Sequence, residues 1–326
     1  MSAQTGHVWR RIPDRLSFCG DTRKRLYISH RWGKLDRETG THNLWLANCY
    51  NEHCTRTFEV QRELWRYVTD PAYDEAASRV KIRPRRRPAT SQTVIQPPGP
   101  AWSLLDMLRK CPQHSALRYL WDRLLDPGYV ARVFQVGFIL ESALPLARNR
   151  LYAPAYQEGK LVGWQCRSVD SAERTQGPKW FSCPGMAKSN ILYNLDQARR
   201  YSTKVIVEGP SDVWNFGAQA AAVFGKLLSD KQVELIAGMT EPGETVVILL
   251  DPELSRDHRA GAPHPIEVAA AALRKVRHLR DHVLPIYLPV GLDPGSADRL
   301  WMRKLIVREA ERAGLPVSFR RKVEVT

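Results

Sequence analysis

The sequence predicts an α/β fold in which a parallel sheet flanked by helices follows an α+β basic subdomain and a small N-terminal β module. Three observations support this fold class. After Lys204, short apolar strands alternate with helical segments, which is typical of a parallel sheet with right-handed crossovers. Residues 150–169 alternate around the turn Glu158-Gly159-Lys160, which indicates a hairpin. A stretch rich in Cys, His, Arg and Trp precedes a basic, proline-rich segment and indicates a separate N-terminal module.

The chain is expected to divide into four segments. The N-terminal module spans residues 1–78, and a linker spans 79–100 with the basic run Arg79–Pro88 and a Pro-Pro-Gly-Pro sequence, the composition of a tether. The α+β subdomain spans 101–203 and the parallel-sheet subdomain 204–326. The basic run is either a solvated tether or a further contact to a phosphate backbone.

Apolar spacing predicts the remaining elements in order. Residues 101–146 have the spacing of short helices. The last helix is expected to begin near Asp298, which is either a further ligand of the site or, as we favour, the N-cap. In the parallel-sheet subdomain we expect strands at 204–208, 245–250 and 283–289 and helices at 211–224, 229–238 and 265–281.

The composition favours a nucleic-acid partner. The formal net charge is +15 and the pI is about 9.8, and Lys and Arg supply sequence-independent affinity for phosphate backbones. A ribosome-associated or anionic-membrane protein can carry the same charge. No apolar run approaches the ~20 residues of a membrane span, and the first residues have no signal-peptide core, so we expect a cytoplasmic chain without a membrane partner. Its 6 Cys are expected to be metal ligands or buried thiols rather than disulfides.

Acidic residues follow each of the three predicted strands. Glu208 follows the first, Asp251 and Glu253 the second, and Asp293 the third. The carboxyl ends of parallel strands meet at one edge of a sheet, and carboxylates gathered there repel one another unless a cation neutralises them. Their oxygens suit Mg²⁺ or Mn²⁺. The alternative is that each acid is a solvated strand end.

Roles for these acids follow from their positions. Asp251, Glu253 and Asp293 are expected to bind the metal, with Glu208 as a further ligand or general base. Asp212 is expected to order Glu208 or a basic partner, although an acid in the first turn of a helix is also stabilised by the helix dipole.

The acidic motifs resemble a known pattern. Glu208-Gly-Pro-Ser-Asp212, Leu249-Leu-Asp251-Pro-Glu253 and Leu292-Asp-Pro294 are similar to the TOPRIM motifs of primases, topoisomerases and some repair proteins. The second motif departs from the usual Asp-x-Asp, because Glu253 is one methylene longer than Asp. The resemblance implies a TOPRIM sheet with a Mg²⁺ or Mn²⁺ site.

The preceding subdomain narrows the resemblance. Its motifs resemble the RNA-polymerase domain of phage and bacterial DNA primases of the DnaG type: Arg150-Leu-Tyr-Ala-Pro, Gly163-Trp-Gln-Cys-Arg167, Pro178-Lys179-Trp-Phe and Lys188-Ser-Asn-Ile-Leu-Tyr-Asn-Leu. This likeness implies that Arg150, Arg167, Lys179 and Lys188 contact phosphates of template and nucleotides. The alternative is that they are ordinary surface bases.

The N-terminal module is similar to a primase zinc ribbon. Cys19, Cys49 and Cys54 flank an expected hairpin that pairs 26–28 with 44–46. Structural zinc takes four ligands, and Leu16 stands where the family has another Cys. His53 or His7 is then the expected fourth ligand. In the alternative reading, the cysteines are small buried hydrophobes.

The resemblance implies a primase that makes short RNA primers de novo on single-stranded DNA from ribonucleotide triphosphates. The sequence contains no G-x-x-x-x-G-K-[ST] loop, so we expect a replicative helicase to be a separate polypeptide. The departures from the bacterial pattern favour a bacteriophage or mobile-element source. A TOPRIM nuclease and a noncatalytic DNA-binding or recombination mediator stay open as alternatives.

Overall fold

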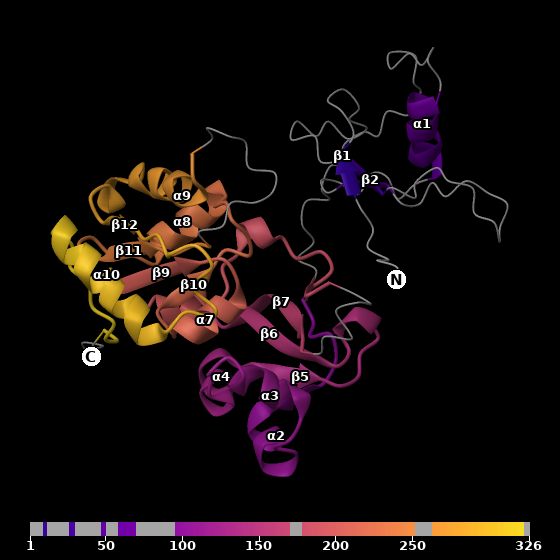
Figure 1. Cartoon of the computed structure of the whole chain (residues 1–326), viewed down its shortest axis with the longest axis horizontal. Helices are drawn as coiled ribbons and strands as arrows, with labels where there is room; N and C mark the ends of the chain where they lie inside the picture. The colour runs from indigo at the N-terminus through magenta and orange to yellow at the C-terminus, as the bar shows by residue number, and fades with distance from the viewer. Residues whose placement is uncertain are drawn as a thin grey trace. The chain divides into compact units, whose positions relative to one another are not determined.

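The computed structural model describes residues 9–11, 26–29, 47–49, 58–69, 95–169, 178–251 and 263–322. The chain divides into two compact units, residues 1–93 and 94–326. Figure 1 labels the elements of both units. Within the ranges given above, no helix is both long and apolar enough to cross a bilayer.

The first unit contains a three-stranded antiparallel sheet in the order β1-β2-β3. Its strands are β1 (Trp9–Arg11), β2 (Leu26–Ser29) and β3 (Ala47–Cys49), and α1 (Phe58–Thr69) follows. Leu26 pairs with Cys49 and Ile28 with Ala47, so the predicted pairing with 44–46 is wrong by three residues. An apolar pattern indicates that a segment is a strand, but the length of the hairpin turn sets which residues of the two strands pair. The prediction chose 44–46 as the partner of 26–28 because this segment is more apolar than 47–49.

An antiparallel sheet opens the second unit, in the order β4-β5-β6-β7-β8. Its strands are β4 (Ala101–Ser103), β5 (Gly137–Ile139), β6 (Arg150–Gln157), β7 (Lys160–Ser168) and β8 (Trp180–Ser182). The predicted hairpin is confirmed as β6–β7. Glu158 and Gly159 both have positive φ, 53° and 72°, as a two-residue hairpin turn requires. Asp196 accepts hydrogen bonds from both of their N–H groups.

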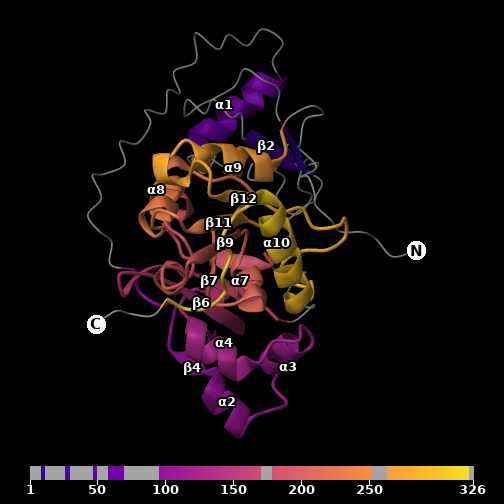
Figure 2. The same cartoon turned by 90° about the vertical axis from the view of Figure 1, so that its left-hand side faces the viewer.

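Short helices join these strands, as the apolar spacing predicted. They are α2 (Leu104–Lys110), α3 (Ser115–Trp121), α4 (Pro127–Phe134) and the 3-10 helix η2 (Pro145–Ala147). Ser103, His114 and Asp126 cap α2, α3 and α4 through side-chain acceptors. Figure 2 shows α2, α3 and α4 grouped at one end of the unit.

The second sheet is parallel throughout, in the order β10-β9-β11-β12. Its strands are β9 (Thr203–Val207), β10 (Ala220–Ala222), β11 (Thr245–Ile248) and β12 (Val283–Pro285). The helices around it are α6 (Leu195–Ala198), α7 (Pro210–Phe216), α8 (Asp230–Gly238), α9 (Pro265–Arg274) and α10 (Arg299–Ala313), with 3-10 turns η3 (Lys188–Asn190) and η4 (Arg277–Leu279).

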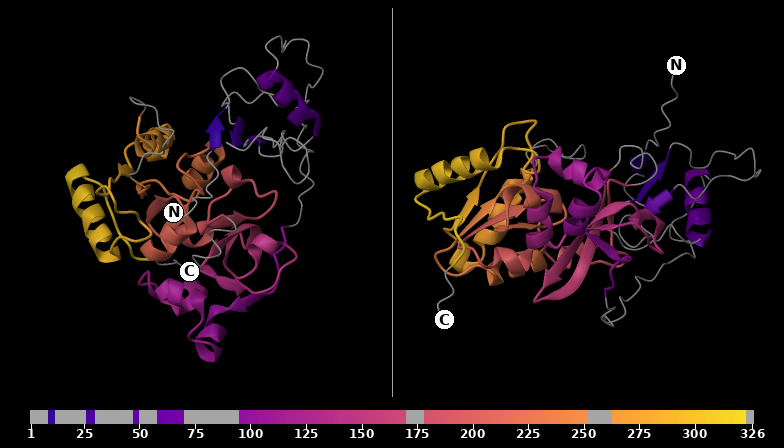
Figure 3. Two further views of the ribbon diagram at one scale, coloured as in Figure 1. Left: turned by 45° about the vertical axis from the view of Figure 1, so that its right-hand side comes forward. Right: turned by 90° about the horizontal axis from the view of Figure 1, so that it is seen from below.

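Helices cover both faces of this sheet. On one face, Val205 and Val207 belong to a core cluster with residues of α7 and α10. On the other, Ile206 clusters with residues of α8 and α9. Successive strand residues point to opposite faces, so a strand buried on both sides is apolar throughout. Figure 3 shows α10 lying along this sheet.

The predicted helix 211–224 is wrong in its second half. α7 ends at Phe216, Gly217 takes a φ of 122°, and the alanines that follow form β10. Alanine is the strongest helix former, but here its small side chain lets β10 pair with β9 and bridge to Tyr193. Tertiary pairing therefore overrides local propensity. The predicted helix 265–281 also ends earlier, because α9 stops at Arg274 and only the 3-10 turn η4 (Arg277–Leu279) follows.

The last described residues tie down the amino-terminal edge of the parallel sheet. We call residues 315–322 the C-terminal strap. Ser318 N–H donates to Thr203 Oγ1 at 2.9 Å, and Thr245 Oγ1 donates to Pro316 O at 2.6 Å. Thr203 and Thr245 are the first residues of β9 and β11, so the strap closes the edge opposite the predicted carboxylates.

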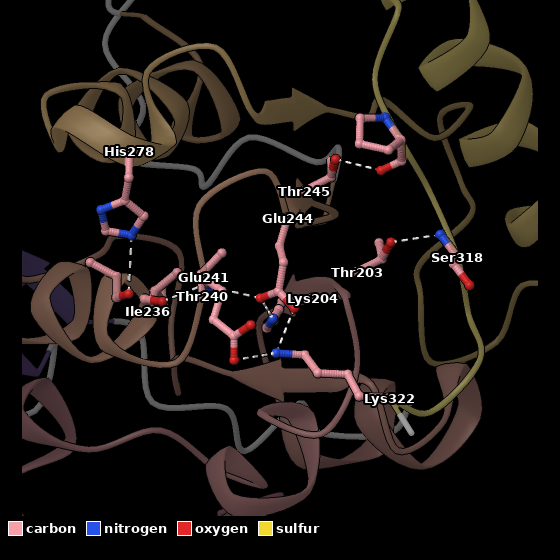
Figure 4. Close-up of polar contacts among 12 residues, drawn as sticks. Thr203, Lys204, Ile236, Thr240, Glu241, Glu244, Thr245, His278, Ser318 and Lys322 are labelled. Carbon is pink, nitrogen blue, oxygen red and sulfur yellow. Dashed lines mark hydrogen bonds and ion pairs between the residues drawn. The ribbon is translucent and has the colours of Figure 1, made fainter. Parts of the chain in front are cut away.

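A buried ion pair lies under this strap (Figure 4). Lys204 is fully buried and its Nζ donates to Glu244. Lys322 Nζ lies 2.5 Å from Glu244 and 3.0 Å from Glu241 Oε1. Burial lowers the pKa of Lys204 to about 8, against the opposing effect of the Glu244 carboxylate. Glu244 is therefore shared between the buried Lys204 and the strap residue Lys322, whose charge also lowers the pKa of Lys204.

Candidate metal and phosphate site

Four of the predicted acids stand at the carboxyl edge of the parallel sheet. Glu208 directly follows β9, and Asp212 lies in the first turn of α7. Asp251 follows the buried residues Leu249 and Leu250 after β11, and Asp293 lies in the segment between β12 and α10. The fifth predicted acid, Glu253, lies outside the described residues.

Backbone N–H groups hold these carboxylates in place. Asp251 N–H donates to Glu208 Oε1 at 3.3 Å, and Gly209 N–H donates to Asp212 Oδ2 at 2.8 Å. Gly295 N–H donates to Asp293 Oδ1 and Ser296 Oγ donates to Asp293 Oδ2, both at 2.8 Å. Asp212 and Asp293 are thereby fixed by residues of their own segments, whereas the bond to Glu208 links it to Asp251 across the adjacent strands β9 and β11.

Gly295 is the point where Asp212 and Asp293 meet. A Cβ added at Gly295 would lie 2.7 Å from Asp212 Oδ1 and 3.0 Å from Asp293 Oδ1. Two carboxylate oxygens from α7 and from the loop after β12 therefore face the same small space. Only a glycine leaves both oxygens where they are.

Gly295→Ala is expected to weaken divalent-metal binding by at least ~10-fold, the lower range for disturbing groups that orient metal ligands. The added methyl must displace one or both carboxylates, and overpacking of this kind costs ~1–3 kcal/mol. Calorimetric titration with Mn²⁺ measures the effect. Gly238→Ala is the matched control, because a Cβ there meets no atom within 4 Å. Equal Mn²⁺ affinity in the Gly295→Ala variant and the wild type would contradict the convergence of Asp212 and Asp293 on one site.

Crowding and burial shift the acids of this site. Burial raises the pKa of Glu208 to about 7, with the Asp251 and Asp212 charges adding to the rise and Lys226 opposing it. Burial likewise raises the pKa of Asp212 to about 7, with Asp251 and Asp293 as further causes. Lys226 Nζ lies 3.9 Å from Glu208 Oε1. A bound cation favours the ionised form of such a carboxyl, so the proton is released to solvent when the metal binds.

The donor set fits a hard divalent cation. In the described part of the chain, no group of three or more His, Cys, Asp or Glu side chains is arranged as a metal site. Mg²⁺ is usually held by one or two carboxylates together with waters and substrate phosphates. The neighbouring Glu208 and Asp251, and the converging Asp212 and Asp293, are pairs of this kind.

Metal affinity is expected to rise with pH between 6 and 8. The ligands must lose their protons to bind, and a carboxyl with a pKa of about 7 is mostly protonated at pH 6. Each such proton lowers the apparent affinity by ~10-fold at one pH unit below the pKa. Mn²⁺ titrations at pH 6, 7 and 8 measure the slope, and an affinity that does not change over this range would contradict the shifted carboxyls.

The same carboxyls give a stability trend of opposite sign in the metal-free chain. Their pKa values are raised on folding, so the folded state holds protons that the unfolded state releases. Their contribution to stability is therefore full below pH ~4, the ordinary range of carboxyls, and is lost as the pH rises through about 7.

Basic side chains of the antiparallel subdomain lie beside this acidic edge. The positive charges of Arg167 and Arg123 lower the pKa of Lys179, after the larger effect of partial burial, while Asp293 and Asp212 act in the opposite direction. Lys179 therefore lies within electrostatic range of two arginines and of two carboxylates. A site with both charge signs close together suits a ligand that is itself an anion with a bound cation.

Aromatic rings hold the two arginines. Arg167 is 2% exposed, and its guanidinium lies 5.4 Å from the Tyr119 ring and 5.3 Å from the Trp180 ring. The Arg123 guanidinium lies 4.9 Å from the Tyr119 ring. Arginine stacks on aromatic faces through cation–π attraction, so Tyr119 sets the spacing of both cations.

The four predicted phosphate contacts are placed differently from one another. Lys179 lies within electrostatic range of Asp212 and Asp293, and Arg167 lies within range of Lys179. Arg150 is 3% exposed and its Nη1 donates to Pro178 O at 2.6 Å, where it positions the residue before Lys179. Lys188 is exposed on η3, and its carbonyl accepts from Gln232 Nε2.

Two basic residues of the site were missed from the sequence. Arg123 follows α3 and Lys226 follows β10, and neither belongs to a recognisable motif. The signal for both is spatial, because Lys226 lies beside Glu208 and Arg123 acts on Lys179 only in the folded chain. The predicted zinc ligands Cys19, Cys54, His53 and His7 lie outside the described residues, and Cys49 ends β3.

No protein-family model matches the chain, and no curated protein sequence matches it. Solved structures do match. The DnaG primase catalytic domain bound to ssDNA is 21% identical over 64% of this chain and 74% of that chain, with a TM-score of 0.47. The Aquifex aeolicus primase, with its zinc-binding and RNA polymerase domains, is 22% identical over 64% of this chain and 58% of that chain, with a TM-score of 0.45.

The RNA polymerase domain of Mycobacterium tuberculosis primase DnaG is 19% identical over 64% of this chain and 81% of that chain, with a TM-score of 0.47. The chain thus spans less than two thirds of the Aquifex protein and more of the isolated catalytic domains. At these identities the chain is similar in fold, and in fold alone, to the catalytic domains of bacterial DnaG primases.

Proposed function

We propose that the chain is a DNA primase that synthesises short RNA primers de novo on single-stranded DNA by metal-dependent nucleotidyl transfer. The observation that carries the proposal is the gathering of Glu208, Asp212, Asp251 and Asp293 at one edge of the parallel sheet. Lys179 lies within electrostatic range of Asp293 and Asp212, and also of Arg167 and Arg123. A nucleoside triphosphate with its cation has the complementary pattern, since its phosphates match the bases and its metal matches the acids.

Each residue type has a role in this reaction. Asp251, Glu253 and Asp293 would hold Mg²⁺ or Mn²⁺, with Glu208 as a further ligand or as the base that accepts the proton of the attacking 3′ hydroxyl. When bound, the cation would stabilise charge on the phosphates. Arg167, Arg123 and Lys179 would neutralise the triphosphate, and Arg150 and Lys188 would be the further phosphate contacts. Asp212 would order the loop at Gly209 through its hydrogen bond. The sheet with its acidic edge would be a TOPRIM domain.

The acidic edge alone does not select polymerisation. Carboxylates with a divalent metal serve phosphoryl transfer of several kinds, including the hydrolysis of a strand. The bases beside them add binding for an incoming triphosphate, and the net charge of +15 supplies attraction for a template strand. The combination favours nucleotide addition over strand cleavage.

The N-terminal module would recognise template, with zinc held by Cys19, Cys49, Cys54 and a fourth ligand at His53 or His7. A zinc measurement on the wild type and a Cys49→Ala variant tests this part. Ribonucleotide triphosphates would be the substrates, a replicative helicase the separate partner, and the cytoplasm the compartment.

One assay separates the candidate functions. The chain is incubated with single-stranded DNA, the four ribonucleotide triphosphates and Mg²⁺ or Mn²⁺, with Asp251→Ala as the control. Metal-dependent oligoribonucleotides that the variant does not make would support a primase. Strand cleavage without synthesis would replace it with a nuclease, and DNA binding without either product, equal in the variant, would replace it with a noncatalytic mediator.

A further inference from the structure

Leu124 is an apolar residue in an unfavourable place. It is 93% exposed and its φ is 56°, in the left-handed region that a leucine rarely adopts. Among the described residues, every other exposed residue with a positive φ is polar or is a glycine. Neither burial nor backbone preference explains a leucine here.

The conformation is fixed by the end of α3. Leu124 N–H donates to Trp121 O at 2.8 Å, and Leu125 N–H donates to Leu120 O at 2.9 Å. This pair of bonds is the Schellman motif, in which the left-handed position is usually glycine. The buried Leu125 locks the turn from the next position. Leu124 is thus held out into solvent by a rigid turn.

This turn lies at the rim of the candidate site. Leu124 directly follows Arg123, whose guanidinium lies over Tyr119 and whose charge acts on Lys179. Trp121 in the same turn is 44% exposed. An apolar tip therefore projects beside the cations Arg123, Arg167 and Lys179, with the exposed Asp122 as the one acid within the turn.

We propose that Leu124, together with Trp121, is a wedge that contacts the bases of single-stranded nucleic acid and unstacks the base that enters beside Arg123. This inference rests on the proposed function and specifies which side chains contact the bases of the template strand. Proteins that bind single strands combine a basic track with exposed rings for the bases, and apolar side chains such as leucine separate stacked bases elsewhere. The charge beside the wedge is positive, which suits a phosphate backbone rather than an apolar protein surface.

The test is the Leu124→Gly variant with single-stranded DNA that carries one 2-aminopurine, whose fluorescence rises when it is unstacked. The wild type is expected to raise the fluorescence at least ~2-fold at saturation, and Leu124→Gly to remove most of that rise. The same variant is expected to raise the thermal midpoint by ~2–4 °C, because glycine relieves the left-handed position. A residue with only a structural role would not gain stability while losing the signal.

Two controls complete the experiment. Leu140→Ala removes another exposed leucine, 51% exposed and next to β5, and should change neither the fluorescence nor the DNA affinity. Trp121→Ala should lose part of the fluorescence rise without the gain in thermal midpoint.

The outcomes separate the wedge from the proposed function. Equal fluorescence with wild type and Leu124→Gly would overturn the wedge, and so would the absence of any rise with the wild type. If Asp251→Asn gives the full rise while neither protein makes RNA, the primase proposal fails and the wedge stands as a base contact of a DNA-binding protein.

Discussion

Asp293→Asn is expected to reduce nucleotide incorporation by at least ~100-fold, more than is usual for a residue that only orients a metal ligand. Asn keeps the size of the side chain but removes the charge that a cation and Lys179 would meet. Asp293 is exposed, so the free energy of unfolding should change by less than ~0.5 kcal/mol. Steady-state incorporation on single-stranded DNA measures the first effect and thermal unfolding the second.

Asp298→Asn is the matched control for this variant. Asp298 lies in the same loop, but its Oδ1 accepts from Trp301 N–H at 2.6 Å as the N-cap of α10. Asn serves as well as Asp at an N-cap, so both activity and stability should be retained. Full activity in Asp293→Asn, or equal losses in both variants, would remove Asp293 from the metal site.

Glu244→Ala is expected to destabilise the chain by ~3–5 kcal/mol, the usual cost of leaving one member of a buried ion pair without its partner. Lys204 is fully buried beneath the strap, and Glu244 also accepts from Glu241 N–H at 2.7 Å. Chemical denaturation at pH 7 measures the loss. A loss of unfolding free energy below ~1 kcal/mol would mean that the Lys204–Glu244 pair contributes no more than a surface ion pair.

A double-mutant cycle sharpens this prediction. Lys204→Met should cost less than Glu244→Ala, because Glu244 keeps Lys322 at 2.5 Å. The double variant Lys204→Met with Glu244→Ala should recover much of the loss, since an apolar replacement of a buried pair is often neutral. Full additivity of the two single losses would contradict the pairing.

The pH dependence of Glu244→Ala has a definite sign. The pKa of Lys204 is about 8 in the fold, below that of an unfolded lysine, and the loss of Glu244 lowers it further. The unfolded state then binds the extra proton, so stability rises with pH between the two values. The destabilisation relative to the wild type is therefore expected to shrink as the pH rises through about 8, the pKa of Lys204 in the wild type, and to change little above it.

The acidic edge was predictable because it depends on a simple pattern. A short apolar strand followed by an acid is visible in sequence at Glu208, Asp251 and Asp293, and parallel strands bring such positions together. The β6–β7 hairpin was equally visible, since its turn residues Glu158 and Gly159 match the backbone that they adopt. Local chemistry and fold agree at these places.

The remaining parts depend on contacts that no local pattern carries. β10 is made of alanines that favour helix until β9 pairs with them. Arg150 is buried with its guanidinium on Pro178 O, which lies 28 residues further along the chain. Arg123 reaches the site because Tyr119 holds it beside Arg167. Burial and side-chain stacking decide these three cases, and both arise only after the chain has folded.

The most direct test of nucleotidyl transfer at the acidic edge is the fate of the γ-phosphate of the first nucleotide. A primer begun de novo keeps the γ-phosphate of its initiating nucleotide, whereas extension of an existing strand releases it from every nucleotide added. With single-stranded DNA, Mn²⁺ and γ-labelled ribonucleotide triphosphates, the wild type is expected to yield labelled oligoribonucleotides and Asp251→Asn none. A parallel reaction with α-labelled nucleotides detects every product, whether or not it begins with a triphosphate. Products seen only in that parallel reaction, or γ-labelled products in equal amount from Asp251→Asn, would contradict priming at this site.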